Sequence, residues 1–215
     1  KKCKYVKYSD MSKLGAADAR VIKTFWAGNR PENDLDAENR ICAAAFECFN
    51  RQGVQKTSMS DIARAAGITR PTLYKYFGNK NEVVFTAVDK EAYRFAESVV
   101  EHARGFKTIE ERIVETIVYV VQEFPRSPNL SLVLQDGMGE TLRARAFSDE
   151  ATQVFSEMTA EPLIEIRPNL AKQGVEITEI MSRFAISMIL FPGRYSPDPK
   201  GLRKLIKRRI LPGLL

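Results

Sequence analysis

The apolar residues of this chain recur with the spacing of an α-helix along nearly its whole length, and few segments alternate with the period of two that marks a β-strand. This periodicity predicts an all-α fold. Glycines follow the helical patterns where helices are expected to end, as at Gly53, Gly67, Gly78 and Gly105. The helices predicted on this basis span residues 36–51, 59–66, 70–77, 80–104, 108–124, 130–135, 140–147, 149–166, 176–191 and 199–210.

The residue types needed for enzymatic or metal chemistry are scarce. The chain contains one histidine, His102, so a zinc site would have too few ligands. It has no glycine-rich phosphate loop and no pattern that pairs a nucleophile with a base. We therefore predict a protein that is not an enzyme and that uses no metal and no cofactor. The net charge of +6 is compatible with a polyanionic partner.

Cysteine usage and hydropathy bear on where the protein works. Cys42 and Cys48 are six positions apart on one predicted helix and so lie on different faces, which argues against a disulfide framework. No apolar run approaches the roughly 18 residues of a membrane span. The opening residues, KKCKYVKYSD, lack the apolar core of a secretory signal. We expect a cytoplasmic protein that makes no membrane contact.

The stretch SDIARAAGITRPTLYKYFGNK, residues 60–80, contains two short helical patterns joined by a glycine. Ala63 is small enough for the two helices to approach closely, and Gly67 can adopt the positive φ of a sharp turn. Ser58 and Asp61 have the spacing of a capping box at the start of the first helix. The predicted shared core of the pair is Ile62, Ala66, Ile68, Leu73 and Phe77.

The second helix of this pair, residues 70–77, is then left with polar and basic side chains outside. Its exposed set includes Arg70, Thr72, Lys75 and Tyr76. A helix about 10–12 Å across fits the major groove of DNA, which is about 12 Å wide. Between positions 51 and 80, six lysines and arginines stand against one acid, as phosphate attraction requires. The alternative is an ordinary pair of short helices with a solvated outer face.

A longer stretch, RICAAAFECFNRQGVQKTSMSDIARAAGITRPTLYKYFGNKNEVV over residues 40–84, resembles the DNA-binding region of TetR-family bacterial repressors. The resemblance is densest in TSMSDIARAAGITRPTLYKYFGNK. It implies a cytoplasmic homodimer that binds a double-stranded, palindromic DNA operator and blocks transcription. The positions that correspond to the family's DNA contacts are Thr57, Ser58, Arg70, Pro71, Thr72, Tyr74, Lys75, Tyr76 and Lys80.

On this basis the chain divides into three predicted parts. Residues 1–34 form a basic N-terminal extension, 35–82 a helix-turn-helix DNA-binding domain, and 83–215 a helical domain for ligand binding and dimerisation. Within the extension we favour a solvated tail and a docked helix over an arm that grips DNA.

The family resemblance also implies that the last two helices, 176–191 and 199–210, form the homodimer interface as a four-helix bundle. The alternative for their apolar stripes is packing within one chain. The segment 108–124 is apolar almost all round and is expected to be buried. Relatives commonly enclose a small apolar effector in this domain. The candidate effector contacts are Thr116, Tyr119, Gln122, Phe124, Met138, Phe155, Met158 and Phe184, each with ordinary core packing as its alternative.

The expected switch is a shift of the connecting helix, 80–104, which would change the spacing of the two DNA-binding units. A second reading keeps DNA binding but removes the small effector. In that reading the larger domain contacts another protein instead.

Overall fold

The computed structural model describes residues 31–135 and 140–215, and the regular structure within these ranges is all helical, as the periodicity predicted. Most of the extension, including its helical pattern, and the effector candidate Met138 lie outside the described residues. The α-helices are α1 Asp34–Gln52, α2 Met59–Ala65, α3 Arg70–Tyr76, α4 Lys80–Arg104, α5 Ile109–Glu123, α6 Glu140–Ala146, α7 Asp149–Ile166, α8 Gly174–Leu190 and α9 Pro199–Leu205. The short 3-10 segments are η2 Leu130–Leu134, η3 Pro168–Leu170 and η5 Leu211–Gly213, and a π turn, η4, covers Ile206–Ile210.

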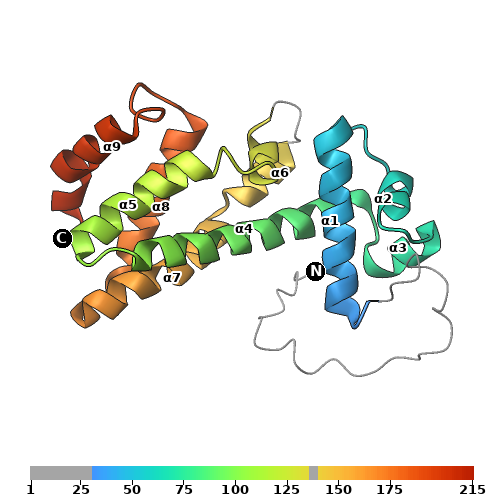
Figure 1. The fold of residues 1–215 in the computed structure, drawn as a ribbon, viewed down its shortest axis with the longest axis horizontal. Helices are drawn as coiled ribbons and strands as arrows, with labels where there is room; N and C mark the ends of the chain where they lie inside the picture. The colour runs from blue at the N-terminus through green and yellow to red at the C-terminus, as the bar shows by residue number, and fades with distance from the viewer. Residues whose placement is uncertain (1–30, 136–139) are drawn as a thin grey trace.

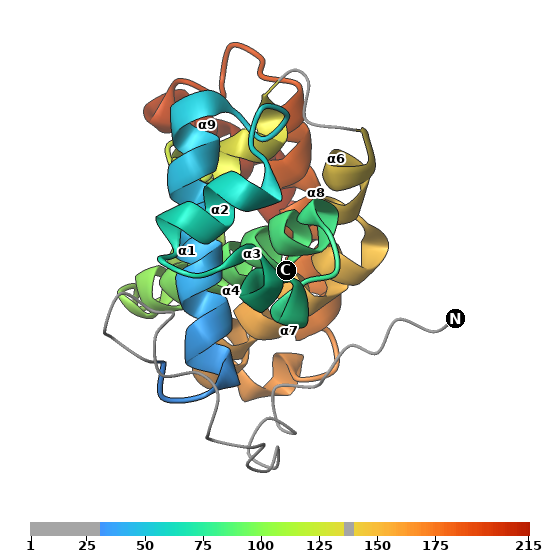
Figure 2. The same cartoon turned by 90° about the vertical axis from the view of Figure 1, so that its right-hand side faces the viewer.

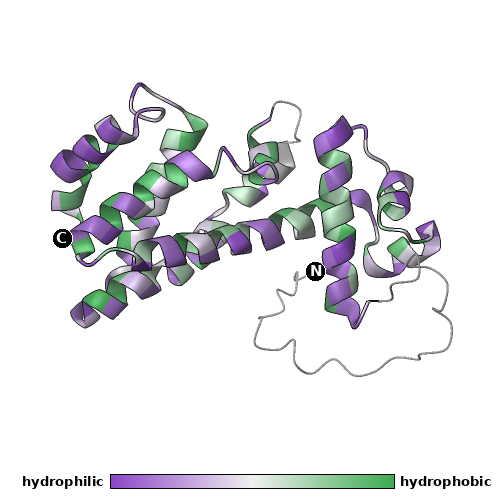
Figure 3. Ribbon diagram, in the orientation of Figure 1, coloured by the Kyte–Doolittle hydropathy of each residue, from purple (hydrophilic) through white to green (hydrophobic). Residues whose placement is uncertain are grey.

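Helices α1, α2 and α3 gather at one end of the molecule, which we call the head (Figure 1). Helix α4 runs from the head into the body, which comprises α5 to α9. Seen from the head, α2 and α3 lie on the near side and the body lies behind them (Figure 2). Hydrophilic and hydrophobic residues alternate in bands along α1 and α4 (Figure 3), as amphipathic helices require.

Local sequence signals fix the ends of the head helices. Ser58 and Asp61 form the predicted capping box at the start of α2. Gly67 has a φ of 68°, in the left-handed region that glycine adopts without strain, and so makes the turn into α3. Pro71 occupies the first turn of α3, where its missing N–H costs no hydrogen bond.

The apolar core of the head extends into neighbouring elements. Val83 and Val84 on α4 pack with the buried residues of α1 to α3, and so do Leu132 and Val133 from η2. Asn50 Nδ2 also donates a hydrogen bond of 3.2 Å to Asn129 Oδ1 just before η2. The head core therefore crosses the predicted boundary between residues 82 and 83.

Helix α5 lies in the middle of the body, and eight of its residues are buried. It packs against α4, α7, α8 and α9, while α7 and α8 form the most extensive helix pair. Gly174 begins α8 where a Cβ would lie 3.0 Å from the side chain of Ile164 on α7. The lack of room for a side chain suits glycine at this position, and α8 starts two residues before the predicted position.

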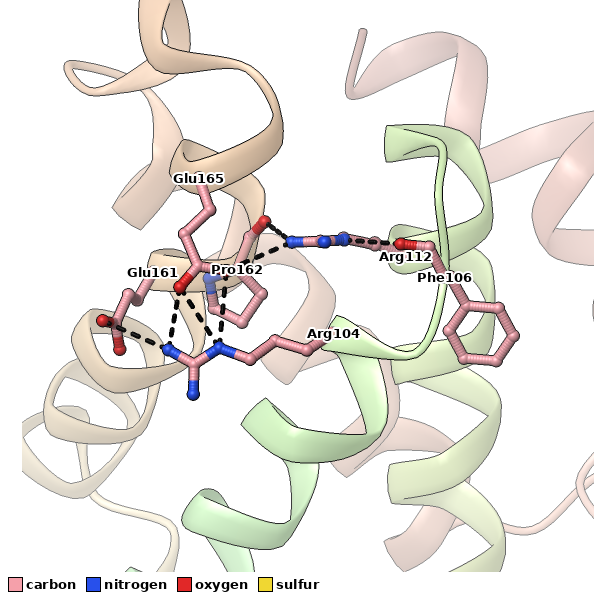
Figure 4. Close-up of polar contacts among 6 residues, drawn as sticks. All are labelled: Arg104, Phe106, Arg112, Glu161, Pro162 and Glu165. Atoms are coloured by element: carbon pink, nitrogen blue, oxygen red, sulfur yellow. Dashed lines mark hydrogen bonds and ion pairs between the residues drawn. The ribbon is translucent and has the colours of Figure 1, made fainter.

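Two arginines, Arg104 at the C-terminal end of α4 and Arg112 on α5, bind these helices to α7 (Figure 4). Arg104, the last residue of α4, donates to Glu165 Oε1 at 2.8 Å and lies 3.2 Å from Glu161 Oε1. Arg112 on α5 donates to the backbone carbonyl oxygens of Phe106 and Pro162. The C-terminal end of α4 is therefore held to α7 by charge-assisted hydrogen bonds.

The C-terminal segment differs from the single helix predicted over 199–210. The α-helix ends at Leu205, and the chain continues as a π turn in which Leu211 N donates to Ile206 O. Pro212 follows and has no N–H with which to continue an α-helical ladder. In the described ranges, no helix combines the length and the apolar character needed to cross a bilayer.

Candidate nucleic-acid interface and effector site

The capping box of α2 positions the only acidic side chain between residues 51 and 80. Asp61 Oδ2 accepts hydrogen bonds from Ser58 Oγ at 2.6 Å and from Ser58 N at 3.0 Å. These bonds, the side-chain bond first, hold the pKa of Asp61 below its ordinary value. Arg64 Nη1 lies 3.5 Å from the same carboxylate. The carboxylate of Asp61 therefore both caps α2 and pairs with one of the basic side chains of this region.

Helix α3 presents its polar side outward because Leu73 is completely buried beneath it. Arg70, Pro71, Tyr74 and Lys75 are exposed on that outer side. The guanidinium of Arg70 lies over the Tyr74 ring, 5.5 Å from its centroid, and donates to the Tyr74 hydroxyl at 3.4 Å. Both groups are donors that suit phosphate and base edges.

The side chains predicted to contact DNA therefore differ in how exposed they are to solvent. Ser58 is exposed, although its hydroxyl is engaged in the capping box, while Thr72, Tyr76 and Lys80 are half-buried. Thr57 is 2% exposed, and its hydroxyl donates to Gly53 O at 2.8 Å. Its side chain thus lies inside the turn between α1 and α2, where it stabilises that turn.

Lys80 has partners within the head that the sequence did not reveal. Its Nζ donates to Val54 O at 3.0 Å and to Gln55 O at 3.2 Å, so it joins the start of α4 to the turn before α2. Lys56, in the same turn, is exposed. Lys56 belongs to the basic set between residues 51 and 80 but is not among the predicted DNA contacts, although its exposure makes it available to phosphate.

The body contains an apolar cavity of about 100 Å³ that is lined by residues of α4, α5, α6, α7 and α8 or directly after them and is partly open to the surface. Two of the predicted effector contacts, Phe124 and Phe155, line it. Most of its walls were not among the predicted contacts, because they come from helices far apart in the sequence. The remaining lining residues are Ala92, Phe95, Val120, Ala146, Phe147, Ala151, Thr152, Ser182, Ile186 and Ile189.

A second cavity of about 10 Å³ lies beside the first and shares Val120, Phe155 and Ser182 with it. Thr116, another predicted contact, lines this smaller space and is 6% exposed. Within the part of the chain that the structure describes, its hydroxyl has no hydrogen-bond partner. Buried hydroxyls usually have one, so Thr116 is an unusual feature of this site.

Tyr119 and Gln122 face the other side of α5. They line an open cleft of about 240 Å³ next to α9, together with His102 and Arg203. Tyr119 stacks on the His102 ring at 4.2 Å, and Gln122 donates to Ser196 O. Residues four apart share a helix face, so Thr116 and Val120 point one way while Tyr119 and Gln122 point another. The structure does not bring the predicted effector contacts into one site.

Two other candidates, Met158 and Phe184, line none of these three spaces. Both are half-buried, and Phe184 packs on the apolar cluster of the body. In the described ranges, no group of three or more metal-binding side chains could hold a metal ion.

The predicted dimer helices divide their apolar residues between two surfaces. On α8, Ile177, Met181 and Ile189 are buried in the chain's own core. Ile180 is 45% exposed on α8, and Phe191, directly after the helix, is 77% exposed. Packing within one chain thus accounts for Ile177, Met181 and Ile189. Ile180 and Phe191 remain largely exposed in a single protomer.

Comparisons with known proteins point to the same family that residues 40–84 resemble. The family described as "Bacterial regulatory proteins, tetR family" matches residues 41–87, which include all of α2 and α3. An uncharacterised HTH-type transcriptional regulator of Mycobacterium tuberculosis is 23% identical over 169 residues, which are 77% of this chain and 81% of that protein.

Solved structures share the helical architecture. The TetR-family repressor AlkX from Dietzia sp., implicated in biodegradation of n-alkanes, has a TM-score of 0.64 at 23% identity and covers 82% of this chain and 94% of its own. FadR of Thermus thermophilus, a TetR-family repressor in complex with lauroyl-CoA, has a TM-score of 0.53 at 23% identity and covers 81% of this chain and 92% of its own.

Proposed function

The chain is a TetR-family transcriptional regulator, and from this premise we propose that it binds a palindromic DNA operator as a homodimer and represses transcription until a small apolar effector releases it. The observation that carries the proposal is the outer face of α3. Its Arg70, Tyr74 and Lys75 side chains are exposed, while the apolar side beneath them is buried in the head core. The proposal extends to a cytoplasmic location, where the operator lies.

In the proposed complex, α3 lies in the major groove. Arg70 and Lys75 donate to base edges, while Tyr74 and the exposed Lys56 donate to backbone phosphates. Ser58 and Lys80 serve mainly to shape the head, since their polar groups are already bonded within it. Pro71, Thr72 and Tyr76 fix the position and outline of the helix. Residues 35–82 supply the DNA contacts. The first turns of α4 complete the apolar core that supports these residues.

The homodimer places two copies of α3 in successive turns of the major groove, about 34–36 Å apart. We assign the interface to α8 and α9, because Ile180 and Phe191 are exposed apolar side chains on or beside α8. Residues 83–215 then provide both the interface and the effector cavity. The palindromic form of the operator follows from the two-fold symmetry of such a dimer.

We place the effector in the 100 Å³ cavity, because it opens between the helix that carries the head and the helices of the body. Phe95 on α4 and Phe147 after α6 both line it. Arg145 on α6 contacts α4 nearer the head, with Nη2 2.7 Å from Asp89 Oδ2 and its guanidinium 5.0 Å from the Phe85 ring centroid. An effector that displaces these walls would therefore move α4. The repressor AlkX, implicated in n-alkane biodegradation, supports an apolar ligand by analogy.

The decisive experiment is selection of bound DNA from a random library with purified protein, followed by variants tested on the selected site. Arg70→Ala is expected to weaken binding to that site by roughly tenfold or more and to weaken binding to random DNA much less, because it removes base contacts. Lys56→Ala is the matched control: it should weaken both and reduce the salt dependence. Equal losses for the two variants on both DNAs would contradict the roles assigned.

One observation favours a second function for the body. The cavity is small for a ligand pocket, since such pockets typically hold about 300–1,000 Å³. A DNA-binding regulator whose body contacts another protein would need no larger space. Under this alternative, repeating the library selection with a panel of apolar metabolites would leave operator affinity unchanged.

A further inference from the structure

We propose that the effector is a small uncharged molecule with an apolar body and one hydrogen-bond acceptor, and that Thr116 donates to this acceptor. The inference rests on the proposed function, because it names the chemical class of ligand for the same cavity. The apolar body would occupy the 100 Å³ cavity, and its polar atom would enter the 10 Å³ cavity beside it.

The walls of the larger cavity argue for an apolar, uncharged occupant. Four aromatic rings line it, those of Phe95, Phe124, Phe147 and Phe155, and aliphatic side chains supply most of the remainder. Among the described residues, no charged side chain lines either cavity. A buried carboxylate or phosphate without a partner is strongly disfavoured, so we expect neither group to enter these two spaces.

The hydroxyls around the smaller cavity show where the polar atom would bind. Three of the four already donate to backbone carbonyls: Thr159 to Phe155 O at 2.9 Å, Thr178 to Ser156 O at 2.8 Å, and Ser182 to Thr178 O at 2.7 Å. The Thr116 hydroxyl has no partner within the described residues. Its free donor therefore selects a hydroxyl or carbonyl oxygen on the ligand.

The combined volume limits the size of this ligand. An apolar cavity of about 150 Å³ holds a benzene molecule in another protein, and the two spaces here are somewhat smaller in total. Because the larger cavity is partly open to the surface, a substituent can extend beyond it, so a substituted benzene or a short branched alcohol or ketone is of the right order. A long acyl chain is too large.

The test uses three matched probes with the full-length protein: p-cresol, toluene and p-toluate, measured by isothermal titration calorimetry. We expect p-cresol to bind wild-type protein, toluene to bind about tenfold more weakly because it lacks the hydroxyl, and p-toluate not to bind. Thr116→Val should reduce the p-cresol affinity about tenfold and leave toluene unchanged, since one buried hydrogen bond is lost. Thr116→Ser, which restores a hydroxyl, should recover most of the p-cresol affinity.

Controls separate binding from folding. Without ligand, Thr116→Val should melt at the same temperature as wild type or higher, because it removes a buried hydroxyl that lacks a partner. Thr86→Val, on the half-buried surface of α4 and outside both cavities, should change neither probe's affinity. Ala92→Leu, which fills the larger cavity, should abolish binding of both neutral probes.

Two outcomes would overturn the inference, and they are distinguishable. If toluene and p-cresol bind equally and Thr116→Val affects neither, the effector is purely apolar and the proposed function stands. If no probe binds while operator binding is intact, both the inference and the effector part of the proposed function fail, and the protein-contact alternative is favoured.

Discussion

Lys80 occupies the first position of α4, and its ammonium group bonds to two backbone carbonyls of the turn between α1 and α2. From the sequence alone this lysine corresponds to a phosphate contact, and nothing local indicates partners 25 and 26 residues away. Thr57 is a similar case, because its burial depends on how that turn folds back onto α1. By contrast, Arg70 and Leu73 follow from spacing within one short helix, and their outward and inward positions were predictable.

We expect Lys80→Met to lower the free energy of unfolding by about 1–2 kcal/mol, because the carbonyls of Val54 and Gln55 lose charge-assisted donors. Urea denaturation monitored by circular dichroism measures this. Lys56→Met is the matched control, since Lys56 is exposed in the same turn and should leave stability unchanged. If both variants unfold at the same urea concentration as wild type, Lys80 is free to act on DNA instead.

Thr116 and Tyr119 show why the candidate effector site was harder to predict than the candidate DNA-binding face. Helix α5 is apolar almost all round, so its periodicity does not distinguish the side that faces the cavity from the side that faces α9. The amphipathic helices of the head have a clear inner and outer side. Which face of α5 meets which neighbour is decided only by tertiary packing.

At the scale of elements, caps made boundaries predictable. The bounds of α4 and α7 match the predicted ranges, because Asn79 and Ser148 cap their first turns. The Asn79 side chain accepts from Glu82 N at 3.1 Å, while the Glu82 carboxylate accepts from Gly78 N and not from Asn79 N, so no reciprocal capping box forms. A missing cap does not account for every shifted boundary: α8, which has no side-chain cap, and α1, which Asn33 caps, both start two residues before their predicted positions.

The contact between α4 and α5 predicts a pH dependence. His102 stacks on Tyr119, and burial lowers the pKa of its imidazole, an effect that the nearby Glu115 carboxylate partly opposes. The folded protein then binds the proton less tightly than the unfolded chain, whose histidine pKa is about 6.5. Stability should therefore fall as the pH drops through about 6.5 towards the lower folded pKa, and it should be fully present above that window.

Thermal melts of wild type and His102→Phe between pH 7.5 and 5.5 measure this effect. The phenyl ring can keep the stacking without titrating, so the variant should lose less stability on acidification. His102 is the single histidine in the chain, so no other histidine contributes to the pH dependence that the two proteins show. The same loss in both proteins would contradict the assignment.

At the scale of the whole molecule, the proposed function requires two heads held at a fixed distance. We expect Ile180→Arg to dissociate the proposed homodimer, because it places a charge on an exposed apolar position of α8 that the interface would bury. Analytical ultracentrifugation should then report a monomer, and affinity for a palindromic site should fall at least tenfold. Tyr93→Arg, at an exposed aromatic on α4, is the matched control and should stay dimeric. A dimer that survives Ile180→Arg would place the interface elsewhere.

Helix α4 has 25 residues and is therefore about 37 Å long. Because Arg104 is hydrogen-bonded to Glu165 on α7, we expect α4 to tilt about its C-terminal end. A tilt of about 5° would shift Phe95 at the cavity wall by only about 1 Å, yet carry Lys80 at the head by about 3 Å. That displacement is close to the spacing of adjacent base pairs, about 3.4 Å. An amplification of this kind would let a molecule the size of a single ring put both reading helices one step out of register.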